Sequence, residues 1–150
     1  MAVTVTDRDL GYKRIVLDFK QLKGKGVKVG VMGGETNEGT AIVDYAVYNE
    51  FGTSRIPPRP FMATTADNNR EKVLAFAGAL VGRMIDGHIN SDTVLRNLGE
   101  FYQARIQETI RNAKSWAAPN APSTIAMKGS SSPLIDSGRL LQSIRYELTK

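Results

Sequence analysis

The chain has 150 residues, a net charge of +5 at pH 7, one histidine and no cysteine, and 41% of its residues are hydrophobic. This length predicts a single domain over residues 1–150 with one real core. The composition excludes a disordered chain, and no apolar run approaches the roughly 18 residues of a membrane span. The absence of cysteine agrees with a reducing compartment.

The charge is unevenly distributed along the chain. Residues 1–30 carry seven Lys/Arg against three Asp/Glu, residues 31–69 carry two against five, and residues 114–150 carry five against two. Basic ends around an acidic middle favour head-to-tail pairing of copies, or a basic surface turned toward a polyanion. A solvated surface without a partner is the third interpretation.

The first ten residues form a polar stretch that we interpret as a loose arm over residues 1–11. It lacks the basic start and apolar core of a signal peptide, so we expect synthesis in the cytoplasm. Apolar residues then alternate over 15–19 and 27–31, which predicts two strands joined by the Lys-Gly-Lys-Gly turn. Phe19 and Leu22 also suit a short helix, and that alternative stays open for the first element.

Four lysines crowd this turn, and they are candidate DNA-facing residues: Lys20, Lys23, Lys25 and Lys28. Lysines also protect strand edges from pairing with other chains, which is the structural alternative. Residues 32–40 are a polar, glycine-rich loop without the Gly-Lys-Ser/Thr ending of a phosphate-binding loop. Helical spacing from Thr40 then predicts a helix that ends at Gly52.

Residues 55–61 contain three prolines, so this segment must be extended and stiff. A stiff segment with two arginines suits recognition, and Arg55 and Arg59 would engage acidic groups on a neighbouring subunit. The alternative is a rigid connector whose Phe61 plugs the core. The sequence leaves both interpretations open.

Two long helices follow. The first runs from about Thr64 to Gly87, and the second begins at a capping residue, Ser91 or Asp92, and extends to Ala113. His88 lies in the connection between them and is predicted to be a surface or capping group rather than a metal ligand.

Residues 114–135 lack periodicity and are long for a loop, which is typical of a functional or a disordered segment. Its apolar side chains predict that the loop either folds back on the domain or is covered by a partner. We expect this assembly loop to be mobile in the free protein and ordered only in an assembly. Asp136 is then predicted to cap a short helix through Leu141, and alternation over 144–148 predicts a strand that joins the sheet near Val27. The predicted fold is α+β: a small, mostly antiparallel sheet packed against two long helices, with a long extended loop before the C-terminal helix and strand.

The sequence contains no thiol, no metal-ligand spacing, no Walker pattern and no Gly-x-Ser-x-Gly. We therefore expect neither an enzyme nor a bound cofactor or metal.

Two separated blocks, residues 46–62 and 116–146, together resemble tailed-phage morphogenesis proteins of the minor tail, tail-completion and neck classes. The first block has the Glu50-Phe51-Gly52-Thr53 turn followed by Pro58-Arg59-Pro60-Phe61. The second has Trp116, Ser123-Thr124-Ile125, Lys128-Gly129 and the run from Pro133 to Leu140, then Ser143-Ile144. Two positions depart from the pattern of these proteins: Asn49 stands where His is frequent, and Ser137 where Thr is usual.

The resemblance implies a structural protein of the head–tail junction, a tail-completion, tail-terminator or neck component. Such a protein would form a ring, contact portal-adaptor, neck or tail-tube proteins, touch DNA without sequence preference, and reside in the virion after assembly in the host bacterial cytoplasm. A small basic nucleic-acid-binding protein is the alternative. The residues that the resemblance implies for subunit or partner contact are Glu50, Phe51, Gly52, Thr53, Arg55, Pro57, Pro58, Arg59, Pro60, Phe61, Trp116, Ile125, Lys128, Leu134, Ile135, Asp136, Gly138 and Arg139.

Overall fold

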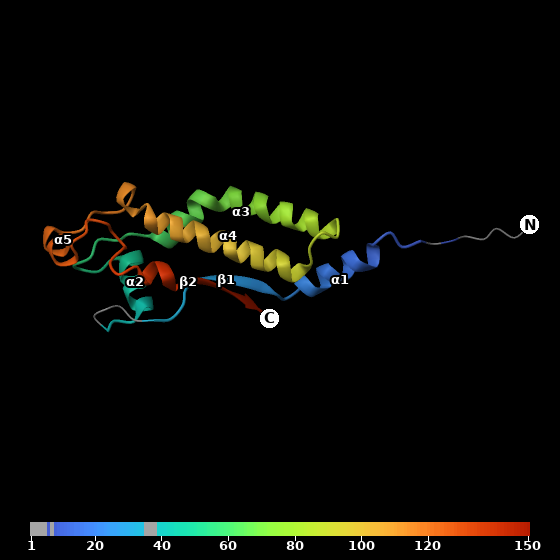
Figure 1. Ribbon diagram of the computed structural model, residues 1–150, viewed down its shortest axis with the longest axis horizontal. Helices are drawn as coiled ribbons and strands as arrows, with labels where there is room; N and C mark the ends of the chain where they lie inside the picture. The colour runs from blue at the N-terminus through green and yellow to red at the C-terminus, as the bar shows by residue number, and fades with distance from the viewer. Residues whose placement is uncertain (1–5, 7, 35–38) are drawn as a thin grey trace, which may run out of the picture.

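A computed structural model describes residues 6, 8–34 and 39–150, and the architecture is α+β as expected (Figure 1). In chain order the described elements are α1 (Tyr12–Leu22), β1 (Gly26–Val31), α2 (Ile42–Phe51), α3 (Phe61–Ile85), α4 (Ser91–Arg111), the 3₁₀ helix η1 (Ala113–Ser115), α5 (Pro122–Lys128), α6 (Arg139–Ser143) and β2 (Ile144–Thr149). None of these helices is both long enough and apolar enough to cross a membrane.

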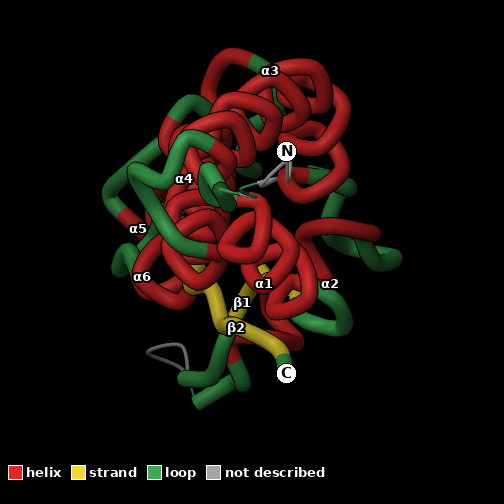
Figure 2. The backbone as a smooth tube through the Cα atoms, turned by 90° about the vertical axis from the view of Figure 1, so that its right-hand side faces the viewer, coloured by secondary structure: helices red, strands yellow, loops and turns green. Residues whose placement is uncertain are grey.

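Helix α4 is the central element of the molecule. It packs against α3 on one side and against both strands on the other, so the body has three layers (Figure 1). The same order of α3, α4 and strands is seen end-on in Figure 2. Helix α1 lies against the end of the α3–α4 pair, whereas α2, α5 and α6 gather at the opposite end of the long axis (Figure 1).

The two strands pair antiparallel, with Val29 opposite Tyr146 and Val31 opposite Ile144. This confirms the expected union of the C-terminal strand with the strand near Val27. Because side chains alternate along a strand, these residues share one face of the sheet. That face packs on α4 at Gly99, where a Cβ atom would lie only 2.6 Å from the Tyr146 ring. Glycine is therefore what lets the helix approach the strands so closely.

The strand predicted over residues 15–19 is wrong, and the helical alternative is correct. Leu17 and Phe19, which produced the alternating pattern, are exposed on α1. The buried side of this helix instead carries Asp18, which pairs with Arg14. Arg14 also donates to the carbonyl oxygens of Met84 and Ile85. These contacts with the C-terminal end of α3 favour the helix over a third strand.

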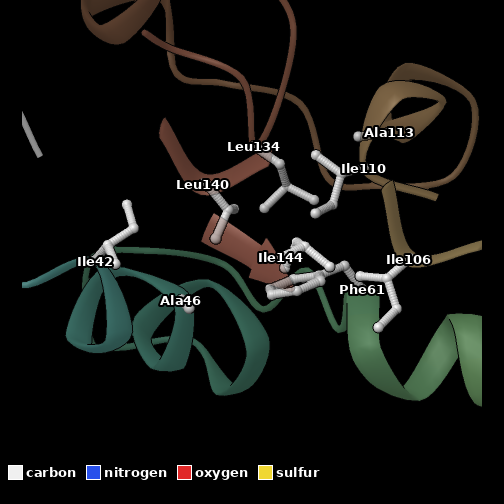
Figure 3. Packing of buried hydrophobic residues seen from close by; sticks show 9 residues of the cluster. All are labelled: Ile42, Ala46, Phe61, Ile106, Ile110, Ala113, Leu134, Leu140 and Ile144. Atoms are coloured by element: carbon white, nitrogen blue, oxygen red, sulfur yellow. The ribbon is translucent and has the colours of Figure 1, made fainter. Parts of the chain in front are cut away.

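The main core lies where α2, α3, α4, α6 and β2 meet (Figure 3). Its buried members are Ile42, Ala46, Phe61, Ile106, Ile110, Ala113, Leu134, Leu140 and Ile144. A second cluster of Leu80, Met84 and Val94 joins the other ends of α3 and α4. Fully burying a side chain of this size stabilises the fold by roughly 1.5–3 kcal/mol.

Three predicted helix boundaries need correction. Helix α3 begins at Phe61 rather than near Thr64, because a proline is tolerated at the start of a helix and Pro60 takes the cap position. The cap of α4 is Asn90, whose Oδ1 accepts from the Thr93 amide at 2.9 Å, and not Ser91 or Asp92. Asp136 caps nothing, since α6 begins at Arg139 after Gly138 and has no side-chain cap.

The segment 114–135 contains more helix than predicted, and its mobility in the free protein stays a prediction. It contains the end of η1 and the helix α5, and Leu134 is buried in the main core. Residues 6 and 8–11 of the predicted arm belong to no helix or strand, and the rest of the arm lies outside the described residues. Residues 35–38 of the predicted loop lie outside them as well.

Candidate functional site

Glu50 links the end of α2 to the beginning of α3. One carboxylate oxygen accepts from the Met62 amide at 2.9 Å and the other from the Ala63 amide at 3.0 Å. The first amides of a helix have no partner within the helix and form its positive end, so a carboxylate there is stabilising. Glu50 therefore caps α3 from a different helix and fixes the two helices relative to each other.

Gly52 and Thr53 build the turn that follows α2. Gly52 has φ 77° and ψ 174°, a conformation that is essentially restricted to glycine. A Cβ atom at this position would lie 3.0 Å from the carbonyl oxygen of Ile56. The Thr53 hydroxyl oxygen accepts from the amides of Arg55 and Ile56, and the Thr53 amide donates to the Ile56 carbonyl at 2.9 Å. The turn is thus closed within the chain.

Arg59 joins the two sequence blocks that carry the resemblance. Its Nε donates to the carbonyl oxygen of Ala118 at 2.7 Å, and Nη2 donates to the carbonyl of Pro119 and to Oδ1 of Asn120, both at 3.1 Å. Nη1 donates to Oδ1 of Asn49 at 3.3 Å. We call this group the Arg59 clamp. It connects the extended segment after α2 with the loop after η1.

The clamp is closed off from solvent. Arg59 is 7% exposed, and burial lowers the pKa of its guanidinium below the ordinary value, although Tyr45 acts in the opposite direction. Arginine keeps its proton in proteins, so a buried positive charge faces four oxygen acceptors here. Hydrogen bonds to a charged group are stronger than neutral ones, which makes the clamp a strong link.

The side chains of Asn49 and Asn120 are oriented by hydrogen bonds that their own amide nitrogens donate. Nδ2 of Asn49 donates to the Tyr45 carbonyl at 2.8 Å, and Nδ2 of Asn120 donates to the Ser132 carbonyl at 3.2 Å. Both amide oxygens are left to accept from Arg59. The sequence marks Asn49 only as a departure from the phage pattern, and it gives no signal for Asn120, which lies in a stretch without periodicity.

The predicted contact residues fall into a buried, a half-buried and an exposed group. Arg59, Phe61 and Leu134 face the interior of their own chain. Phe61 lies in the core, as the connector interpretation expects. Arg59 binds within its own chain, at the clamp, and not to a neighbouring subunit as predicted. The half-buried group comprises Glu50, Gly52, Pro60, Trp116, Ile125, Lys128, Ile135 and Gly138. Trp116 is half-buried, and its Nε1 donates to the Thr109 carbonyl. The exposed group comprises Phe51, Thr53, Arg55, Pro57, Pro58, Asp136 and Arg139. For these residues, contact with a partner stays a prediction.

A pocket of about 430 Å³ lies beside the clamp, where the two sequence blocks meet. Ile42 and Tyr45 line it from α2, Ile56 from the extended segment, and Met127, Lys128 and Arg139 from the second block. Met127 is 81% exposed. The described residues include no group of three or more His, Asp or Glu side chains placed to hold a metal ion.

The outer surface of α2 is apolar and exposed, and we call it the α2 face: Val43, Val47, Tyr48 and Phe51. Spacings of four and eight residues place three of these side chains on one stripe of the helix. Phe51 is the most exposed of them at 77%. A second apolar surface, the α1 face, is formed by Tyr12, Val16 and Phe19, which follow one another at spacings of four and three residues on one stripe of α1. Tyr12 and Phe19 are exposed and Val16 is half-buried.

The four candidate DNA-facing lysines have different surroundings in the fold. Lys25 pairs with Asp92 at 2.9 Å, and Lys28 lies opposite Glu147 in the strand ladder. Lys20 and Lys23 are exposed on and just after α1. His88 is exposed after α3, as expected for a surface group.

The site is thus an intrachain junction next to the exposed apolar α2 face, whereas the α1 face lies toward the other end of the molecule (Figure 1). No protein-family model, curated protein or solved structure matches the chain.

Proposed function

We propose that this protein is a structural subunit of the head–tail junction of a tailed phage, in the tail-completion, tail-terminator or neck class. It associates with copies of itself into a ring and contacts portal-adaptor, neck or tail-tube proteins. The observation that carries the proposal is the Arg59 clamp. Residues 46–62 and 116–146, which resemble phage morphogenesis proteins in two separate blocks, meet there in one structural unit.

The surface of the protein supports an assembling role. Monomeric proteins seldom expose contiguous groups of large apolar side chains, and such groups mark interaction sites. The α2 face adjoins the first block, and Met127 lies exposed in the second block beside the pocket. Both blocks thus combine residues that organise the fold with apolar residues that are free to bind a neighbour.

The test is the native mass of the purified full chain, measured by light scattering over a wide concentration range, with negative-stain images of the associated species. We expect the mass to rise with concentration and the particles to be annular. A monomer throughout the range contradicts the proposal. If that monomer also bound DNA with a steep dependence on salt, the result would favour the small basic nucleic-acid-binding protein instead.

A further inference from the structure

Exposed apolar side chains concentrate on two helices at opposite ends of the molecule. In the part of the chain that the structure describes, eight of the eleven exposed large apolar side chains belong to residues 10–19 or 43–51. Helix α1 and helix α2 lie toward opposite ends of the long axis (Figure 1). The α1 face and the α2 face of one chain therefore do not cover each other.

The charges on the two faces are opposite. Lys13, Lys20 and Lys23 are exposed on and beside α1, and the ion pairs formed among the described residues involve none of them. Asp44 is exposed on α2 next to Val43. The surrounding sequence extends this contrast, since residues 1–30 are net basic and residues 31–69 net acidic. Pairing α1 with α1, or α2 with α2, would bring like charges together.

The two helices also match in length. Helix α1 has 11 residues and α2 has 10, so at 1.5 Å per residue they are about 16 Å and 15 Å long. Two short amphipathic helices of equal length can lie against each other along their whole apolar stripes. The apolar side chains, the charges and the lengths of the two helices thus all fit a pairing of the α1 face with the α2 face.

We propose that the α1 face of one copy binds the α2 face of the next copy, so that the subunits associate head to tail. Tyr12, Val16 and Phe19 then pack on Val47, Tyr48 and Phe51, while the lysines of α1 lie near Asp44. Such a contact uses two different surfaces of each subunit and forms a ring if the rotation between subunits closes. The inference deepens the proposed function by naming its subunit interface, and it rests on that proposal for the association of copies.

The experiment uses two full-length variants, each with one blocked face. Phe19→Asp blocks the α1 face and Phe51→Asp blocks the α2 face. Both side chains are exposed, at 45% and 77%, so both variants should keep the wild-type circular dichroism spectrum and melting temperature. Each variant alone should lose association by about thirtyfold or more, the effect of removing a central anchor. Mixed together, they should form a one-to-one dimer, because each retains one intact face.

Leu74→Asp is the matched control, since Leu74 is 65% exposed on α3 and belongs to neither face. This variant should associate like the wild type. A mixture of Phe19→Asp and Phe51→Asp that stays monomeric, or either of these variants alone associating as strongly as the wild type, would overturn the inference.

The outcomes separate the interface from the proposed function. If the wild type forms rings and both blocked variants also do, the interface lies elsewhere and the proposed function stands. If the blocked variants complement each other while the wild type forms only open filaments, the interface stands and the proposed ring is contradicted. A wild type that stays monomeric at every concentration contradicts both.

Discussion

Arg59 Nε donates a hydrogen bond to the carbonyl oxygen of Ala118 at 2.7 Å, and the two residues are 59 positions apart in the chain. This bond is the shortest of the four that the guanidinium donates. It ties the proline-rich segment to the loop after η1. The link depends on the planar geometry of the guanidinium, which a single ammonium cannot reproduce.

Arg59→Lys should therefore lower the free energy of unfolding by about 2–3 kcal/mol, because several buried oxygen acceptors lose their donors. Urea denaturation followed by circular dichroism measures the change. Arg55→Lys is the control, since Arg55 is an exposed arginine in the same segment and should stay within about 0.5 kcal/mol of the wild type. Equal effects of the two substitutions would show that the clamp does not stabilise the fold.

Glu50→Ala should destabilise the protein by about 1 kcal/mol, the usual effect of removing a helix cap. The amides of Met62 and Ala63 would lose their acceptor, so fraying should appear first at the start of α3. Hydrogen exchange of those two amides is the direct measurement. Glu71→Ala, an exposed change further along α3, should leave their exchange unchanged.

Gly52→Ala should be more damaging than Gly129→Ala, although both glycines have positive φ angles of 77° and 65°. A methyl group at residue 52 meets the Ile56 carbonyl and Pro58 at 3.0 Å, whereas nothing lies within 4 Å of a Cβ atom at residue 129. We expect a loss of about 1 kcal/mol at residue 129 from backbone strain alone, and about 2–3 kcal/mol at residue 52. Thermal melts of the two variants make the comparison, and equal losses would contradict it.

Gly99→Ala should disturb the packing of α4 on the sheet. The new methyl group would come within 2.8 Å of Val27 and closer still to Tyr146, so the strands must move and we expect a loss of about 1–3 kcal/mol. Gly82→Ala is the matched control, because it lies inside α3 with nothing within 4 Å of a Cβ atom. That change should stabilise the protein by roughly 0.5–1 kcal/mol through helix propensity. The two alanines thus act in opposite directions.

Tyr102 makes the stability of the folded protein vary with pH in the alkaline range. Burial raises the pKa of its phenol, and the negative charge of Asp67 adds to the increase. The folded protein therefore holds the phenol proton of Tyr102 more tightly than the unfolded chain, in which a tyrosine has a pKa of about 10. The stability that this raised pKa contributes is fully present below about pH 10. It is lost as the pH rises through the pKa of Tyr102 in the folded protein. Tyr102→Phe should reduce the loss of stability above about pH 10 in urea titrations, and an unchanged slope would contradict this.

The longest elements could be predicted from the sequence because their apolar residues repeat with a helical period over many turns. Helix α3 and helix α4 are of this kind, and strand β2 has a clear alternation. Helix α1 is short, and its exposed Leu17 and Phe19 imitate a strand. Contacts of Arg14 with the end of α3 support its helical form, and these tertiary contacts leave no local pattern in the sequence.

The site was partly predictable. Glu50 and Arg59 stand out in the sequence as charged residues of a conspicuous segment, but their partners do not. Glu50 binds main-chain amides, and Arg59 binds two main-chain carbonyls and two asparagine side chains. Main-chain groups are present at every residue and carry no signature of their own. The exposed Phe51, by contrast, looks in the sequence like an ordinary member of the helical stripe of α2.

The pairing of β1 with β2 also has a consequence for protein synthesis. Val31 meets Ile144, so the sheet cannot close until almost the whole described chain has left the ribosome. The guanidinium of Arg59 likewise has no hydrogen-bond acceptors from Ala118, Pro119 and Asn120 until these residues have been synthesised. At translation rates of about 5–20 residues per second, the interval between the synthesis of Arg59 and that of Ala118 lasts several seconds. Chains truncated before residue 144 would lack the sheet, and we expect cellular proteases to degrade such fragments.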